Sequence, residues 1–343
     1  MKKWLLLLIG IVSSAQDVHY SQYFMPNLWI NPAMTGFMPS TFRAVFAYRN
    51  QWRSITPYPY KTFYGSIDMP LLQEVLFPDY LGVGVMVLED RAGHSRLGTT
   101  EGLVSVAYHR SFSSNEEAPI YIGVGLQLGY GIRSFETDKL IFGSQFTIFG
   151  PDPTVPSGEY FVNTSVGFID LNTGIWGFFA FNPHTSLFLG GSVYHLNNPQ
   201  TYFYEPIPMY PRLTSYVGFI TDIGTRSSIV LTFLHLRQHE YTEYTAGAGW
   251  VYYPWPKGYG SGFRGRDKSI TLGMWYRIGD AIYPAFRYDS QSWGFGVSYD
   301  ITLSSLRVAN LMRGGVEVFV AFYGFKFKKR LKSRQIYCPK IAG

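Results

Sequence analysis

Side-chain character that alternates at every second residue is the feature that most constrains how this chain can fold. From Trp293 to Ile301, bulky apolar residues at odd positions alternate with Gly, Ser and Asp. A period of two is the signature of a β-strand whose two faces meet different surroundings. The same pattern recurs at 81–87, 270–278, 282–288 and 316–322, and no convincing stretch has helical periodicity. The sequence therefore predicts an all-β protein.

The number and length of these segments narrow the architecture further. About fourteen of them, most of about ten residues or more, are separated by Gly, Pro, Asn and Asp clusters typical of turns. Strands of soluble proteins cluster near five or six residues, whereas membrane barrels use about 9 to 11. The lengths and the even number favour a transmembrane outer-membrane β-barrel of about 14 antiparallel strands. The expected ranges are 41–50, 60–69, 81–90, 99–111, 119–133, 165–181, 184–195, 212–223, 226–237, 241–253, 267–278, 281–289, 292–301 and 314–327.

Aromatic residues gather at the ends of these segments, as in 58–60, 202–204 and 252–255. Aromatic girdles at the two membrane interfaces would explain this placement. The alternative is that aromatic residues are simply common in strands of any kind. Together with the strand lengths, the placement favours a barrel in lipid.

The first fifteen residues have the organisation of a secretory signal peptide. Met1-Lys2-Lys3 is basic, 4–12 is apolar, and Ser13-Ser14-Ala15 supplies the small residues of a cleavage site. We expect residues 1–15 to be cleaved and the mature chain to begin at Gln16. No cysteine directly follows the apolar run, so the pattern excludes a lipoprotein anchor. Residues 16–40 are then an N-terminal segment, 41–327 the barrel and 328–343 a basic tail.

The net charge of +6 suggests nucleic acid as a partner, but the location of the charges contradicts this. Two of the 29 Lys and Arg residues lie in the signal peptide, and seven lie between Lys326 and Lys340, where no acid is present. The remaining 20 basic residues and the 23 acidic residues together give a net charge of −3. The body of the protein is not basic, so no nucleic-acid partner is expected.

A set of short motifs in chain order resembles the PorP/SprF family of type IX secretion system outer-membrane proteins of Bacteroidetes. The first are DVHYSQYFMPNLWINPAMTG at 17–36, the string YRNQW at 48–52 and PYKT at 59–62. Later ones are GMWYR at 273–277, GVSYD at 296–300, Gly314-Gly315-x-Glu317 and Cys338-Pro339-Lys340. The tail departs from the pattern, because a basic spacer from Lys326 to Arg334 precedes the Cys-Pro element.

The resemblance implies a barrel without enzymatic activity or cofactor in the outer membrane of a Gram-negative bacterium. Such a protein would serve secretion and surface attachment of cargo with C-terminal sorting domains, in some members gliding adhesins. The implied partners are outer-membrane lipid, the periplasmic ring and lipoprotein components of the machine, and the cargo domains. The alternative is a FadL-like passive channel for small solutes.

Two groups of residues are candidates for the barrel interior. Asn31 and Pro32 precede the first strand, where an Asn-Pro element could fold into the lumen as a plug or form an ordinary turn. Arg49, Asn50, Gln51 and Trp52 end that strand. One interpretation is that they brace a plug or line a cargo-contacting lumen; the other is that they supply turn chemistry and a girdle Trp.

The basic tail is a candidate docking strip for an acidic periplasmic surface, formed by Lys328, Lys329, Arg330, Lys332 and Arg334. A charged stop that keeps the tail out of the bilayer is the alternative. If both chain ends are periplasmic, the connection at 254–266 is unusually long for that side.

No pattern of catalytic or metal-ligating residues is expected to form a site. The pair His235 and His239 lies in a strand and turn, not on one helical face. Asp138, Asp152 and Glu159 match no EF-hand spacing.

Overall fold

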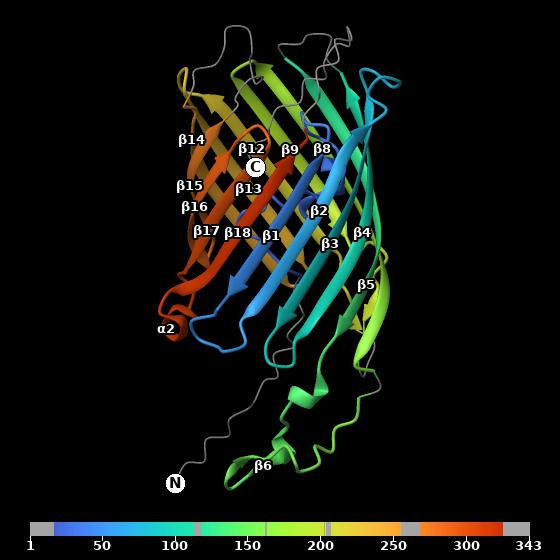
Figure 1. Cartoon of the computed structure of the whole chain (residues 1–343), viewed down its shortest axis with the longest axis vertical. Helices are drawn as coiled ribbons and strands as arrows, with labels where there is room; N and C mark the ends of the chain where they lie inside the picture. The colour runs from blue at the N-terminus through green and yellow to red at the C-terminus, as the bar shows by residue number, and fades with distance from the viewer. Residues whose placement is uncertain are drawn as a thin grey trace.

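The computed structural model describes residues 17–112, 118–161, 163–201, 203, 207–254 and 268–324. Fourteen antiparallel strands form one closed barrel, in which β1 pairs with both β2 and β18 (Figure 1). The predicted fold is confirmed, and each predicted range overlaps one strand of the wall. The wall strands are β1 (Arg43–Gln51), β2 (Tyr60–Leu71), β3 (Tyr80–Ala92), β4 (Leu97–Ser111), β5 (Ile120–Ser134), β8 (Ser165–Asn182), β9 (Thr185–Tyr194), β12 (Arg212–Asp222), β13 (Ser227–Gln238), β14 (Tyr241–Tyr252), β15 (Ser269–Arg277), β16 (Ala281–Asp289), β17 (Trp293–Thr302) and β18 (Arg313–Tyr323).

Three parts of the sequence interpretation concern residues outside the described ranges. They are the signal peptide at 1–15, most of the connection at 254–266, and the tail at 328–343 with its candidate docking residues.

The two ends of the barrel differ in their connections. The end at which β1 stops carries the connections 135–164, 195–211 and 303–312, and we call it the loop end; it is at the bottom of Figure 1. The opposite, turn end has short connections such as 183–184 and 290–292. The small elements of the loop end are η2 (Thr137–Lys139), η3 (Gly143–Gln145), β6 (Phe146–Thr147), β7 (Gly150–Pro151), β10 (Gln200–Thr201), β11 (Ile207–Pro208) and α2 (Arg307–Asn310).

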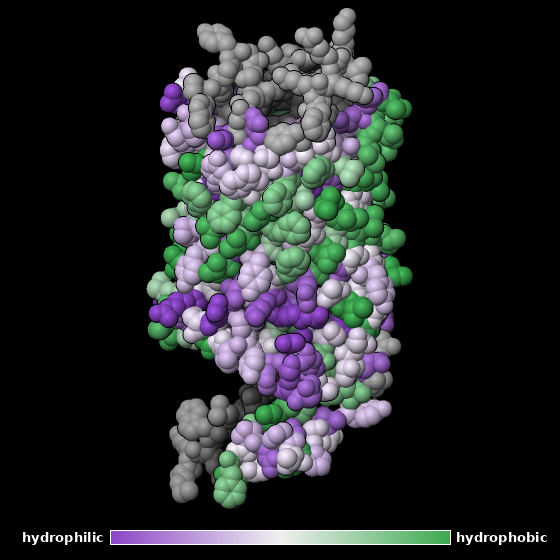
Figure 2. Space-filling view, in the orientation of Figure 1, coloured by the Kyte–Doolittle hydropathy of each residue, from purple (hydrophilic) through white to green (hydrophobic). Residues whose placement is uncertain are grey.

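The wall separates apolar from small and polar side chains as the alternation predicts. On β5, Leu126 and Leu128 point outward and are 62% and 56% exposed, whereas Gln127 between them is 1% exposed and points inward. Figure 2 shows the resulting apolar surface across the middle of the barrel, with hydrophilic residues gathered towards the loop end. This arrangement suits a barrel with lipid outside and polar groups inside.

Residues 17–38, which we call the luminal segment, fill much of the barrel interior. Asp17 contacts Gln238 at the loop end, while β1 begins at the turn end. The segment therefore crosses the lumen, and its first described residue lies at the end opposite to the start of β1. It contains two short helices, α1 (Asn27–Ile30) and η1 (Pro32–Met34). Among the described residues, no helix is long and apolar enough to span a membrane.

A charged residue on the lipid-facing surface should destabilise the barrel more strongly the closer it lies to the middle of the bilayer. We expect Leu126→Arg, at the middle of β5, to lower the free energy of unfolding by about 2–4 kcal/mol. Ile132→Arg points outward from the same strand near the loop end and should cost at most about 1 kcal/mol. Denaturant unfolding in lipid vesicles measures both, and equal losses would contradict the assigned outward band.

Candidate functional site

A buried carboxylate on β18 fixes the luminal segment near its start. Glu317 accepts hydrogen bonds from the backbone N–H groups of Ser21 at 2.7 Å and Gln22 at 2.8 Å. The hydroxyl of Ser21 also donates to Asp300 of β17. A buried ion needs hydrogen-bond partners. Both carboxylates find some of theirs in the luminal segment.

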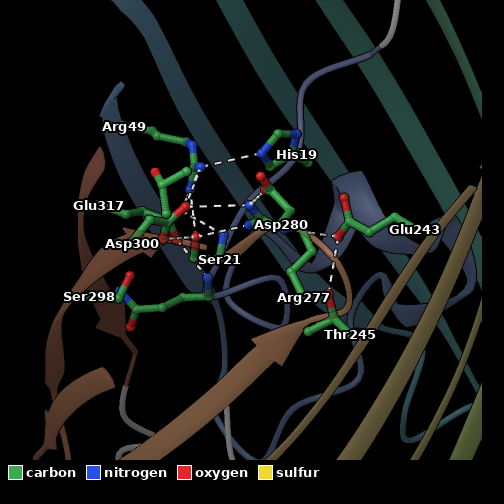
Figure 3. Close-up of polar contacts among 12 residues, drawn as sticks. His19, Ser21, Arg49, Glu243, Thr245, Arg277, Asp280, Ser298, Asp300 and Glu317 are labelled. Atoms are coloured by element: carbon green, nitrogen blue, oxygen red, sulfur yellow. Dashed lines mark hydrogen bonds and ion pairs between the residues drawn. The ribbon is translucent and has the colours of Figure 1, made fainter. Parts of the chain in front are cut away.

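Arg49 of β1 pairs with both carboxylates (Figure 3). Its Nη2 lies 2.7 Å from Asp300 Oδ2, and its Nη1 lies 3.1 Å from Glu317 Oε2. Arg49 and Glu317 are direct register partners where the first and last strands meet. Its Nη1 also donates to Ser21 Oγ at 2.6 Å. One guanidinium thus connects β1, β17, β18 and the luminal segment.

Arg277, at the end of β15, approaches Ser21 from the other side (Figure 3). Its Nη2 donates to Ser21 Oγ at 3.3 Å, and its Nη1 lies 2.9 Å from Asp280 and 3.5 Å from Asp300. Its Nε lies 3.4 Å from Glu243. We call Ser21, Arg49, Glu243, Arg277, Asp300 and Glu317 the luminal charge cluster.

A second set of charges holds Asp17 at the loop end. His195, which directly follows β9, lies 2.7 Å from Asp17 through Nε2 and 2.8 Å from Asp170 through Nδ1. Burial by itself lowers the pKa of His195, but the two carboxylates outweigh it and raise the pKa to about 10. The imidazolium can therefore donate to both acids at neutral pH. Arg212 adds an ion pair to Asp17 at 3.3 Å.

The middle of the luminal segment is packed into the wall with little room to spare. Leu28, Ile30, Asn31 and Ala33 are fully buried. The side chain of Asn31 caps η1 by accepting from Ala33 N–H, and its Nδ2 donates to Ile175 O at 3.0 Å. Asn31 therefore joins the local turn to β8.

Glycines in the wall allow the segment to come this close. A Cβ built on Gly125 would lie 2.4 Å from Ala33 N and 2.5 Å from Pro32 C, and one on Gly82 would lie 2.0 Å from Thr35 O. Beyond these contacts, Gly36 N–H donates to Asp68 at 2.8 Å, and Asp68 also pairs with Arg43. The segment is thus held at both ends and along its middle.

The sequence-based candidates lie in different places. Asn31 and Pro32 are buried in the lumen against β5 and β8. Gln51 and Trp52 line a chamber near the loop end, as Arg49 does. Asn50 lies on the opposite face of β1, where its Nδ2 donates to Tyr48 Oη.

Most of the luminal charge cluster was not among the sequence-based candidates. Five of its six members nevertheless come from the motifs quoted above, and Glu243 does not. Ser21 belongs to SQY, Arg49 to YRNQW, Arg277 to GMWYR, Asp300 to GVSYD and Glu317 to the Gly-Gly-x-Glu element. The signal was the presence of ionisable or hydroxyl residues in separate motifs.

Between the middle of the luminal segment and the loop end lies a chamber of about 1320 Å³. Its lining includes Trp29 and Leu103, together with residues from the loop-end connections such as Phe135 and Met209. A much smaller and mainly apolar cavity of about 60 Å³ lies beside 21–25. The lumen is therefore filled in its middle and hollow near the loop end.

No group of three His, Cys, Asp or Glu side chains within the described ranges is placed to hold a metal ion. His235 lies 3.2 Å from Ser215, and His239 stacks on Tyr210. Asp152 accepts hydrogen bonds from Thr154 in an exposed turn.

Residues 12–322 match the family described as "Type IX secretion system membrane protein PorP/SprF". No curated protein matches the chain in sequence.

Solved structures similar to this chain include three bacterial membrane proteins. The Ralstonia pickettii toluene transporter TbuX shares 11% identity at a TM-score of 0.49, with 87% of this chain and 93% of that one covered. A Pseudomonas aeruginosa FadL homologue shares 12% at 0.42, with 86% and 93% covered. The KdgM porin shares 9% at 0.37, with 82% and 98% covered. Likeness at this level does not extend to what those proteins transport.

Removing Arg49 should leave two buried carboxylates without their shared cation. We expect Arg49→Ala to destabilise the protein by about 3–5 kcal/mol and to raise amide hydrogen exchange at 17–25. Arg96→Ala, which removes the exposed pair with Glu136, should cost at most about 1 kcal/mol. Unchanged exchange at 17–25 in Arg49→Ala would show that the cluster does not hold the segment.

Adding one methyl group at the closest approach should disturb the luminal segment. Gly125→Ala places a Cβ against the backbone of Pro32 and Ala33 and should cost about 1–3 kcal/mol, with faster exchange at 31–36. Gly102→Ala on neighbouring β4 meets nothing within 4 Å, so it serves as the control. Thermal unfolding and hydrogen exchange measure the pair, and equal behaviour of the two variants would refute the tight fit.

Proposed function

Because the chain belongs to the PorP/SprF family of type IX secretion system membrane proteins, we propose that it is a closed, non-enzymatic scaffold of that system. In this role it supports secretion and surface attachment of cargo with C-terminal sorting domains, including gliding adhesins. The family is one of secretion-system membrane proteins, not of enzymes. The chain is an outer-membrane β-barrel, and its partners are other parts of the secretion machinery.

The observation that carries the closed-scaffold proposal is the luminal segment. It crosses the barrel interior and is held by the luminal charge cluster, by Asp17 and by close packing at Gly125. Moving it would separate buried ions from their partners, which costs several kcal/mol. We therefore propose that the luminal segment acts as a permanent plug, and that the protein works through its surfaces.

A FadL-like passive channel is the alternative function. A channel would need a continuous path past the luminal segment. The cavity beside 21–25 measures only about 60 Å³, against about 1320 Å³ for the chamber, and this narrowing favours a scaffold over a pore.

The partners in this proposal bind at opposite ends. Cargo sorting domains meet the loop end, and the periplasmic ring and lipoprotein components meet the turn end. The basic residues Lys328, Lys329, Arg330, Lys332 and Arg334 contribute a docking strip for an acidic periplasmic surface. Lipid covers the apolar band, and nucleic acid has no role.

Conductance in planar lipid bilayers separates the scaffold from the channel. The intact protein should show no steady current, whereas a variant lacking 17–38 should conduct through the emptied lumen. Arg96→Ala is the matched closed control. A steady current from the intact protein would contradict the plug proposal and favour the channel.

The docking strip is tested by replacing its five basic residues with Gln in cells that depend on this protein. Cargo secretion should fall while the amount of heat-modifiable barrel in the outer membrane stays normal. Affinity purification of the intact protein should recover secretion components and cargo. Normal secretion by the substituted protein would overturn the role of the strip, and recovery of the barrel alone would count against the scaffold.

A further inference from the structure

One buried acid in the chamber has no partner among the described residues. Glu101 of β4 is 7% exposed and lines the chamber near the loop end. Within the described ranges it makes neither a hydrogen bond nor an ion pair. Other deeply buried carboxylates of the lumen are paired: Asp300 and Glu317 with Arg49, and Asp170 with His195. Leaving an ionised carboxylate buried and unpaired is costly, so Glu101 differs from its neighbours in a way that needs a reason.

Three cations that line the chamber do not pair with Glu101. His195 lies between Asp17 and Asp170, and Arg212 pairs with Asp17 and stacks over the Trp29 ring. Arg133 of β5 faces the same chamber, where its Nη1 donates to the neutral hydroxyl of Thr201 at 3.3 Å. None of them is within ion-pair distance of Glu101. Glu101 thus has no ion-pair partner among the described residues.

A second carboxylate increases the demand for a cation. Asp90 of β3 also lines the chamber and is paired in register with Thr99, two residues before Glu101. The two acids are therefore diagonal neighbours on the inward face of adjacent strands. Within the part of the chain that the structure describes, Asp90 accepts a hydrogen bond from the hydroxyl of Thr62, at 2.7 Å, and this hydroxyl brings no positive charge.

The surroundings of Glu101 suit an apolar body attached to that cation. Leu88 lies opposite Glu101 in the register of β3, and Leu103 is the next inward residue of β4; both line the chamber. On the other side the register partner is Gly131, which has no side chain. The Phe168 ring packs against Gly131, so the carboxylate sits on an apolar wall within a chamber that also contains Trp29, Trp52, Tyr60 and Tyr194.

We propose that the chamber is a binding site for an ammonium or guanidinium group carried on an apolar body, with Glu101 as the paired anion. Either the side chain of a lysine or arginine in a polypeptide or a small organic amine supplies this chemistry. The site does not depend on the secretion role, because it follows from the charges and shape of the chamber alone.

The test is calorimetric titration of the purified full-length protein with two cationic probes. They are the capped tripeptide acetyl-Leu-Lys-Leu-amide and hexylammonium chloride. Their neutral counterparts are the same tripeptide with norleucine in place of lysine, and hexanol. We expect the cationic probes to bind and Glu101→Gln to weaken them by about tenfold or more, as loss of a charge-assisted hydrogen bond predicts.

Two further variants separate charge from structure. Glu89→Gln removes an outward carboxylate of β3 that pairs with Arg91 and does not line the chamber, so it should bind like the intact protein. Glu101→Asp keeps the charge and should retain more binding than Glu101→Gln. Heat-modifiable migration checks that each variant forms the barrel.

The probes also identify the source of the cation. Tighter binding of the tripeptide supports a polypeptide ligand, and tighter binding of hexylammonium supports a small amine. The proposal is overturned if Glu101→Gln binds as the intact protein does, if the neutral probes bind equally well, or if no cationic probe binds at about 10 mM, where even weak sites are detectable.

Discussion

The pairing of buried charges at Ser21 is the interaction on which the rest of the lumen depends. Arg49 and Arg277 bring two positive charges into a space that Asp300, Glu317 and Glu243 also occupy. The arginines do not complete the arrangement alone, because Glu317 also accepts two backbone amides of the luminal segment. Barrel and segment therefore satisfy each other's polar groups, and neither has its native environment without the other.

This dependence divides the lumen into two parts with different properties. Around 21–36 the interior is packed with buried aromatic and aliphatic side chains, and wall glycines admit the chain. Nearer the loop end the same walls surround a chamber that contains charged and aromatic residues. A lumen packed in its middle and hollow near the loop end agrees with the proposed role as a closed scaffold.

The wall was predictable from the sequence, whereas the lumen largely was not. Alternation identifies a strand such as β17 because Gly294, Gly296 and Ser298 face inward while Phe295 and Val297 face outward. No comparable local rule marks the luminal segment, since α1 has only four residues. Its position depends on contacts between residues almost 300 positions apart, as between Ser21 and Glu317. Asn31 and Arg49 could be proposed from their residue types, but their partners could not. Glu101 gave no sequence signal, because nothing local distinguishes a paired from an unpaired acid.

The seam between β1 and β18 has a consequence for how the barrel is assembled. The last strand to be synthesised carries Glu317, and the first carries its register partner Arg49. A slip of one residue along this seam would turn one of the two side chains towards lipid and leave the other charge buried without its partner. Only the native register lets both strands and the chain inside them neutralise one another. A barrel closed in the wrong register would therefore be less stable than the native one, because it would leave charges in its interior unpaired.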